Sequence, residues 1–296
     1  MTASATPRPP TIAGPDPDTR PPRAKFPAGT CDSHAHVFGP QGLFPYLPNA
    51  GYIPPDALPQ DYVRMLNTIG CQRAVLVQPS IYGTDNSRMV AAMISGIFSF
   101  RGVAVVEETI SDAELERLHR AGVRGVRVNL ASETPGLSIE QVPRLAARIK
   151  PLGWHLQFLV RLDRVPDFGR QIAQLPVACV LDHFGHLSAA GDGDVHSQGA
   201  RSLLELARLE HAWFKLTAPY RLSTGWPLHA DLAPLAQALV TAAPDRCVWG
   251  TDWPHPNAAR MPNDGDLADA LGRWLPDAQA RQAVLVDNPA RLYDFK

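Results

Sequence analysis

Two histidines with one residue between them lie early in the chain, and side chains of this type at this spacing could take part in chemistry. His34 and His36 end a short apolar run at residues 30–37. If that run is an extended strand, both imidazoles project to the same side, because side chains alternate along a strand. The pair then aims at one point and could serve a metal or a substrate. The alternative is two surface histidines on an edge strand.

A second signal lies near the other end of the chain. Residues 246–256 read as another apolar strand with an acid, Asp252, at its tip. A site that uses both segments needs a fold in which the first and the last strands meet. The elements between them therefore decide how these side chains can be positioned.

Composition narrows the class of protein. The 296 residues carry a formal net charge of −1, which gives no electrostatic case for nucleic acid or an anionic membrane as the main partner. No apolar run approaches the roughly 20 residues that span a bilayer. The four cysteines lack CxxC spacing, so we expect buried, reduced thiols and a cytoplasmic protein. They are Cys31, Cys71, Cys179 and Cys247.

The first 27 residues differ from the rest. They hold eight prolines among Thr, Asp and Arg, and they lack the continuous apolar segment of a secretory signal. Such a stretch cannot bury enough apolar surface to fold alone. We expect an extended arm over residues 1–27, either loose or laid over a single domain at residues 28–296.

Strand and helix patterns alternate along the rest of the chain. The predicted strands are 29–37, 74–77, 102–106, 125–130, 154–160, 177–183, 212–216 and 247–251. Helical spacing appears between them, as at 59–69 and in a helix expected to carry Met89, Val90, Met93, Ile94 and Ile97. Eight such units predict an α/β fold, a (β/α)8 TIM barrel in one domain. An open doubly wound sheet is disfavoured because no Gly-rich phosphate turn follows the first strand.

In a TIM barrel the chemistry lies at the carboxyl ends of the strands. Polar and ionisable groups converge on that rim from strands one, two, four, six and eight and from the loop after strand seven. They are His34, His36, Gln78, Ser80, Arg127, Asn129, Asp182, His183, Tyr220, Arg221 and Asp252. The long connection at 38–58 is a candidate lid.

From residue 29 to 295 the chain resembles the metal-independent branch of the amidohydrolase superfamily, typified by 2-pyrone-4,6-dicarboxylate lactonase. The matching stretches include DSHAHVFGP at 32–40 and WGTDWPHPN at 249–257. The others lie at 83–86, 125–129, 182–183, 213–215 and 287–293. Order and spacing both hold over the whole predicted domain.

The resemblance implies a site that opens a lactone ring. Asp252 would be the general base that takes a proton from water. His34, His36 and His183 would polarise the lactone carbonyl and stabilise the oxyanion. The bland alternatives are a helix N-cap for Asp252 and a buried, hydrogen-bonded imidazole for His183.

The resemblance also implies contacts to an anionic substrate. Arg127 and Arg221 would clamp a carboxylate, which a guanidinium matches with two parallel hydrogen bonds. Tyr52 in the lid and Ser80 after the second strand match substrate-contacting positions. On composition alone, either arginine would be read as a solvated surface charge and Tyr52 as packing.

Departures from the family pattern bear on the substrate. The family's lactonase has a second arginine a few residues after the strand-four arginine, where this chain has Glu133, and a tyrosine where it has Leu159. Arg161 could compensate only if it turns inward. Because an acid repels an anionic ligand, we expect a related lactone with a different or smaller anionic pattern, from aromatic or sugar-acid catabolism.

We expect no organic cofactor and no metal. The superfamily's binuclear centre needs a strand-four lysine, which is lacking, and a strand-five histidine, whereas His155 lies at the amino end of that strand. A single Zn²⁺ on His34, His36, His183 and Asp252 stays open. So do a Zn-dependent hydrolase or decarboxylase, a lactone isomerase, a non-catalytic acid-binding protein and a homo-oligomer.

Overall fold

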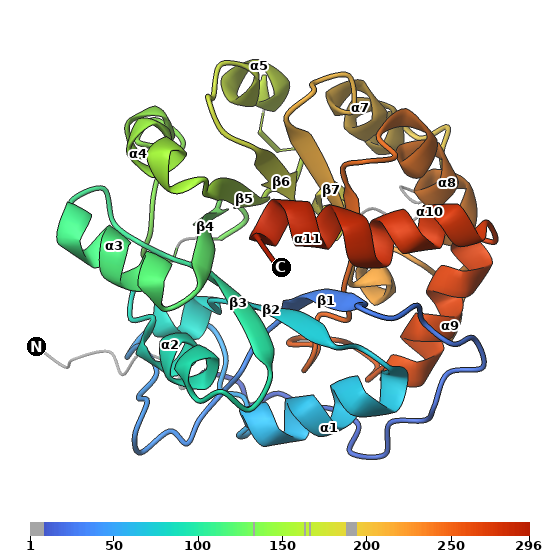
Figure 1. Ribbon diagram of the computed structural model, residues 1–296, viewed down its shortest axis with the longest axis horizontal. Helices are drawn as coiled ribbons and strands as arrows, with labels where there is room; N and C mark the ends of the chain where they lie inside the picture. Colours follow the sequence, from blue (N-terminus) through green and yellow to red (C-terminus); the bar gives the residue numbers. More distant parts are fainter. Residues whose placement is uncertain (1–8, 133, 163, 166, 188–193) are drawn as a thin grey trace, which may run out of the picture.

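Eight parallel strands and the helices between them form a barrel (Figure 1). The structure, a computed structural model, describes residues 9–132, 134–162, 164–165, 167–187 and 194–296. The strands are β1 Cys31–Ala35, β2 Arg73–Val77, β3 Ser99–Ala104, β4 Val123–Asn129, β5 His155–Leu159, β6 Cys179–Leu181, β7 Ala212–Leu216 and β8 Cys247–Trp249. Each strand pairs with the next along the chain. The predicted TIM barrel is confirmed.

Helices surround the strands (Figure 1). They are α1 Pro59–Ile69, α2 Ser87–Ile94, α3 Asp112–Arg120, α4 Val142–Ile149, α5 Phe168–Ala173, α6 His183–His186, α7 Gln198–Leu206, α8 Ala233–Ala242, α9 Asp264–Trp274, α10 Ala278–Gln282 and α11 Asn288–Tyr293. One π-helical turn, Ala283–Asp287, joins α10 to α11. None of the helices in the described ranges is long and apolar enough to cross a membrane.

Helix α1 shows how the sequence sets an element. Proline fits its first position because the missing N–H has no intrahelical partner there. Tyr62, Met65, Leu66 and Ile69 recur at helical spacing and are buried. Gly70 then ends the helix with φ of 86°, a left-handed conformation that glycine adopts readily.

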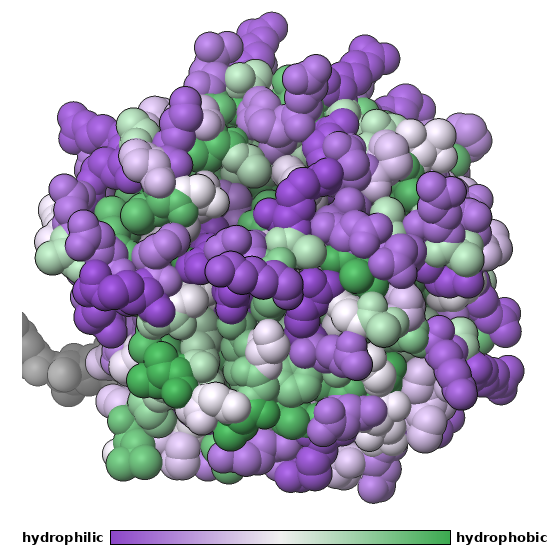
Figure 2. All heavy atoms as spheres, in the orientation of Figure 1, coloured by the Kyte–Doolittle hydropathy of each residue, from purple (hydrophilic) through white to green (hydrophobic). Residues whose placement is uncertain are grey.

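Several element boundaries differ from the prediction, and those of β3 and α2 show how. Strand β3 begins at Ser99, earlier than predicted, and ends at Ala104. Helix α2 ends at Ile94 because the chain turns at Gly96, whose φ is 72°. Ile94 and Ile97, expected on a helix, are 68% and 41% exposed. In Figure 2 hydrophobic side chains gather in the lower left, over the region where Figure 1 places α2.

The C-terminal helix covers one end of the barrel, as Figure 1 shows with α11 lying across it. The Tyr293 ring lies 5.3 Å from the ring of His155, at the amino end of β5. The guanidinium of Arg101 lies 4.8 Å from the Phe295 ring. The C-terminal segment therefore packs over the amino ends of β3 and β5, at the end of the barrel away from the carboxyl ends of the strands.

Residues 9–27 lie against the barrel. The backbone N–H of Ile12 donates to the carbonyl of Ile53 in the 38–58 connection, at 3.1 Å. The backbone N–H of Arg20 donates to the Asn263 side chain at 3.0 Å. Of the two alternatives for the arm, its described part is laid over the domain. All four cysteines are buried and unpaired, as predicted.

The barrel closes where the first strand meets the segment after the last. The Asp252 N–H donates to the His34 carbonyl at 2.8 Å, and the His36 N–H donates to the Trp253 carbonyl at 2.7 Å. These bonds join β1 to the chain beyond β8. The same residues were predicted to form the site, so closing the barrel also assembles them.

Asp32, fully buried under that junction, connects three elements. Its carboxylate accepts hydrogen bonds from the Thr251 N–H at 2.9 Å, the Thr251 hydroxyl at 2.6 Å and the Tyr62 hydroxyl at 2.9 Å. Burial raises the pKa of Asp32 to about 6, and the Thr251 hydrogen bonds limit the rise. The group is therefore largely ionised at neutral pH, where these donors stabilise it.

We expect Thr251→Val to lower the free energy of unfolding by about 2 kcal/mol, since it removes one hydrogen bond to a buried carboxylate at nearly constant volume. The Trp253 N–H also loses its acceptor, the Thr251 hydroxyl, at 3.0 Å. Urea unfolding at pH 7 measures the change.

Thr68→Val is the matched control. The Thr68 hydroxyl bonds only to the Arg64 carbonyl on the outer side of α1, at 3.0 Å, so we expect a change within about 0.5 kcal/mol. Equal losses in the two variants would contradict a special role for Asp32.

Candidate active site

A cavity of about 400 Å³ opens at the carboxyl ends of the strands. Seven of the eight predicted site residues line it: His36, Tyr52, Ser80, Arg127, His183, Arg221 and Asp252. The eighth, His34, lies beneath them and is fully buried. The structure thus brings together residues from β1 and the position just after it, from the 38–58 connection, from β4 and from the segments after β2, β6, β7 and β8.

One carboxylate oxygen of Asp252 faces three imidazoles. The distances from Oδ1 to Nε2 are 3.5 Å for His36, 3.6 Å for His34 and 4.0 Å for His183. This oxygen is buried and accepts no hydrogen bond from the described residues. It is therefore an available proton acceptor at the floor of the cavity.

The other oxygen is held in place. Oδ2 accepts a hydrogen bond from the Tyr220 hydroxyl at 2.5 Å and one from Nη2 of Arg221 at 3.2 Å. Nη2 also donates to the Pro256 carbonyl at 2.9 Å. The carboxylate is oriented by these contacts and does not cap a helix, since the next helix, α9, has Asn263 as its N-cap.

The backbone at Asp252 is strained. Its φ is 66°, in the left-handed region, where any residue with a Cβ carries some backbone strain, although Asp tolerates it better than most. The turn follows β8 directly and points the side chain across the barrel mouth. Strain of this kind persists only where the surrounding contacts hold it, as those from Tyr220 and Arg221 do here.

The electrostatics keep Asp252 ionised and the imidazoles of His34 and His183 neutral. Burial alone would raise the pKa of Asp252, but its contacts with His183, His36 and Arg221 outweigh burial and hold that pKa well below its usual value. Burial lowers the pKa of His183 well below its usual range and that of His34 to about 3. At neutral pH an anionic acceptor therefore stands beside neutral rings.

Of the three imidazoles that line the cavity, those of His36 and His183 are anchored through Nδ1. In His36 this atom lies 2.8 Å from the Val77 carbonyl, which can only accept, so Nδ1 carries a proton. In His183 it lies 2.8 Å from the Thr217 hydroxyl. This anchoring turns Nε2 of both rings toward Asp252, which is how metal-binding histidines are usually held.

The donors present fit a single metal ion. His34, His36 and Asp252 place ligand atoms within 4.8 Å of one another, and so do His34, Asp182 and His183. Nε2 of His34 and Oδ1 of Asp252 are buried without hydrogen-bond partners among the described residues. Imidazole and carboxylate suit Zn²⁺. His155 lies at the other end of the barrel, so it cannot join a binuclear centre here.

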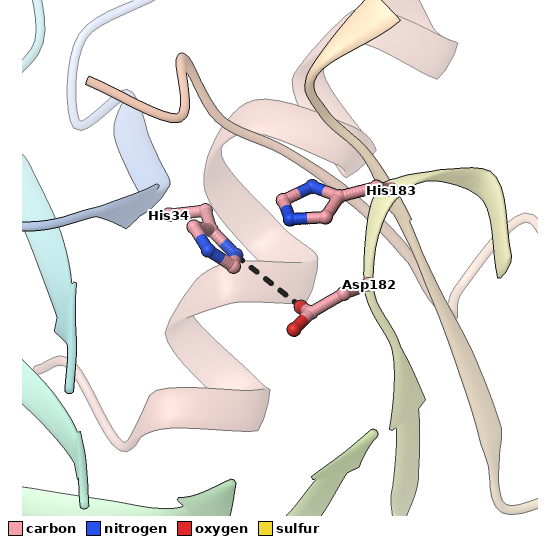
Figure 3. Close-up of side chains that lie close together, drawn as sticks. All are labelled: His34, Asp182 and His183. Carbon is pink, nitrogen blue, oxygen red and sulfur yellow. Dashed lines mark ion pairs between the residues drawn. The ribbon is translucent and has the colours of Figure 1, made fainter. Parts of the chain in front are cut away.

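A second buried acid, Asp182, lies below the cavity and was predicted only as a member of the rim. Its Oδ1 is 3.2 Å from Nδ1 of His34, as Figure 3 shows. Its Oδ2 accepts from Nε of Arg127 at 3.3 Å and from Gln157 at 3.2 Å. Burial alone would raise the pKa of Asp182, but His34, Lys215 and Arg127 hold it well below its usual value.

Lys215 received no role from the sequence, and Tyr220 was predicted only as a member of the rim. Lys215 is fully buried in β7, and burial lowers its pKa to about 8. A signal was available, because a lysine inside an apolar strand is rarely buried without a partner. Tyr220 carries no comparable signal, since a loop tyrosine gives no hint of which carboxylate it reaches.

The predicted substrate-binding residues differ in how they are held. Arg127 is buried against Asp182, whereas Arg221 keeps Nε without a hydrogen-bond partner among the described residues. Burial raises the pKa of Tyr52 to about 12, and a hydrogen bond with Ser80 opposes the shift. The binding roles of all four stay predictions.

One of the departures from the family pattern lies at the cavity. Leu159 lines it, next to Ser132 and Thr134. Glu133 lies outside the described residues. Arg161 is partly buried and does not line the cavity. The pKa of His186 is lowered to about 4, mainly by burial and in smaller part by nearby charges that include Arg161.

The structure combines a TIM barrel with histidines on and just after its first strand and a carboxylate after its last strand. This combination can be compared with known protein families. Residues 31–295 match the family described as amidohydrolase, and the chain belongs to this family. It is 39% identical over 285 residues to the 2-pyrone-4,6-dicarboxylate hydrolase of Comamonas testosteroni, covering 92% of each chain. This confirms the resemblance drawn from the sequence.

Other relatives agree in kind. The 4-sulfomuconolactone hydrolase of Hydrogenophaga intermedia is 34% identical over 96% of this chain and 95% of its own. An apo crystal structure from Agrobacterium tumefaciens superposes with a TM-score of 0.82 at 27% identity, covering 93% of this chain and 99% of that one. The homologues named here by activity are lactone hydrolases.

Proposed function

We propose that this protein hydrolyses a small carboxylate-bearing lactone, with Asp252 as the base that activates water. The proposal rests on one observation, the different surroundings of the two carboxylate oxygens of Asp252. Oδ2 is fixed by Tyr220 and Arg221, while Oδ1 faces the cavity as an unused acceptor. The named activities of the relatives support the same chemistry.

In the proposed reaction, Oδ1 takes a proton from a water molecule as its oxygen attacks the lactone carbonyl carbon. The carbonyl oxygen becomes an oxyanion, which an imidazole N–H stabilises in the tetrahedral intermediate. The intermediate then collapses, the ring C–O bond breaks, and the proton held by Asp252 passes to the leaving oxygen. The product is a ring-opened acid, and the carboxylate is regenerated.

The substrate's carboxylate would complete the site. Arg127 and Arg221 supply the matching charge at the cavity wall, with Tyr52 and Ser80 beside them. A carboxylate bound to Arg221 would weaken its hold on Asp252 and so raise the pKa of that acid. The strong hold in the free protein is therefore compatible with a base in the complex.

The cavity wall supports a lactone other than the dicarboxylate of the Comamonas relative. Leu159 offers no hydrogen bond, and Ser132 and Thr134 are neutral donors and acceptors. Hydroxyls and one carboxylate match this surface better than two carboxylates do. An isomerase would use the same groups to move the ring, and product analysis separates the two activities.

A zinc-dependent hydrolase is the second candidate, favoured by the Nδ1 anchoring of His36 and His183. His34, His36, His183 and Asp252 would hold the ion. It would polarise the carbonyl and lower the pKa of a bound water. In either case Arg127 and Arg221 would bind the substrate's carboxylate.

We expect Asp252→Asn to lower kcat at least 1,000-fold with a small change in KM, because the amide cannot take a proton. The assay is a panel of 2-pyrone-4,6-dicarboxylate, muconolactones and aldonolactones. Asp277→Asn is the control, since asparagine caps the start of α10 equally well. An Asp252→Asn enzyme within tenfold of the wild type would exclude the base.

The pH profile gives an independent test. A base works only when unprotonated, so activity is lost as pH falls through its pKa. Because the pKa of Asp252 is held well below 3.8 in the free protein, kcat/KM should stay flat from pH 7 down to about 5. The acid limb of kcat should lie at higher pH. An acid limb of kcat/KM near neutral pH would assign the step to another group.

Metal removal separates the two candidates. We expect chelator-treated protein, with its metal content measured on the same sample, to keep full activity with far less than one ion per chain. Adding Zn²⁺ should then bring no gain. Activity that appears only in proportion to bound Zn²⁺ would make the three histidines ligands and overturn the metal-free proposal.

A further inference from the structure

Lys215 places a positive charge inside the barrel, directly under the site. Its Nζ donates to the Ser33 carbonyl at 2.9 Å and lies 3.8 Å from Oδ1 of Asp182. The Tyr293 ring, from the helix that covers the barrel end, is 5.8 Å away. Nζ is also 3.2 Å from Nδ1 of His34. The reaction described above assigns this lysine no part.

Nδ1 of His34 lies between two groups of opposite character. Lys215 Nζ and Asp182 Oδ1 are each 3.2 Å from it, and Figure 3 shows the Asp182 contact. An ammonium only donates and a carboxylate only accepts. A neutral His34 must therefore either accept from Lys215, with its proton on Nε2, or donate to Asp182, with Nε2 bare.

The geometry favours the lysine. The Lys215 contact to Nδ1 satisfies hydrogen-bond geometry, whereas Oδ1 of Asp182 accepts no hydrogen bond from the described residues. Asp182 is already bound through Oδ2 by Arg127 and Gln157. We propose that Lys215 is a positioning residue that keeps the proton of His34 on Nε2.

The proposal makes His34, and not His36, a donor that can stabilise an oxyanion. A neutral His36 has its only N–H committed to the Val77 carbonyl, so its Nε2 cannot donate. Nε2 of His34, 3.6 Å from Asp252 Oδ1, is then a donor fixed beside the base. This inference rests on the proposed lactone hydrolysis. Metal binding by His34 would instead require its proton on Nδ1, with Asp182 as acceptor.

The tautomer can be measured directly. Protein labelled with ¹⁵N-histidine and freed of metal is examined by NMR, with His34 signals assigned by their loss in His34→Gln. We expect a protonated Nε2 and a hydrogen-bonded, unprotonated Nδ1. A protonated Nδ1 in the wild-type protein would overturn the proposal, whatever the variants do.

Two substitutions test the lysine. Lys215→Met cannot donate, so kcat should fall about 100-fold with KM within threefold, and the His34 proton should move to Nδ1. Lys215→Gln keeps an N–H donor without charge and should retain more kcat and the Nε2–H signal. A Lys215→Met protein that folds by circular dichroism but keeps the wild-type His34 signals would overturn the proposal.

Thr217→Val is the spectroscopic control, because its hydroxyl contacts Nδ1 of His183 and should change only that ring's signals. The two proposals can fail separately. If the wild type opens no lactone yet loses the Nε2–H signal in Lys215→Met, the function is wrong and the role of Lys215 stands. If lactone hydrolysis depends on Asp252 while His34 carries its proton on Nδ1, the reverse holds.

Discussion

A buried carboxylate, Asp32, holds the barrel closed and the site together. It accepts hydrogen bonds from the backbone and hydroxyl of Thr251, from Tyr62 and from the N–H of His34. Four donors offset the cost of burying the charge, a cost that no apolar contact could offset. His34 itself donates to Asp32, and Asp252 directly follows Thr251 in the sequence. The hydrogen bonds that close the barrel therefore also fix the positions of these two site residues.

Two buried acids inside the barrel, Asp182 and Asp252, are each paired with positively charged side chains. Asp182 is bound by Arg127 and lies near Lys215, and Asp252 is bound by Arg221. Each acid therefore has a cation of its own, so neither must be neutralised on folding. In the proposed reaction, an anionic substrate bound to Arg221 would compete with Asp252 for this guanidinium, which would tie ligand binding to the basicity of Asp252. Of the groups around Asp182, Arg127 lines the cavity, whereas Lys215 is fully buried beneath it and contacts His34.

The alternation of strand and helix patterns was sufficient to predict the barrel. Each pattern is a spacing of apolar residues, and that spacing reflects which face of the strand or helix is buried. The side to which His34 and His36 point followed from the strand period in the same way. The partners of Asp252 and the contact of Lys215 with His34 depend on loop backbone and inter-strand register, which no local pattern encodes. Ile97 was misplaced because one glycine ended its helix early.

Because the site forms only when the barrel closes, it cannot form before the segment after the last strand has been synthesised. Thr251 leaves the ribosome 219 residues after Asp32. At the usual rates of translation that interval is roughly ten to forty seconds. Throughout it, β1 has a partner on one side only and its buried acid lacks two of its donors. The candidate site is thus among the last parts of the nascent chain to be assembled, and one edge of β1 stays unpaired until then.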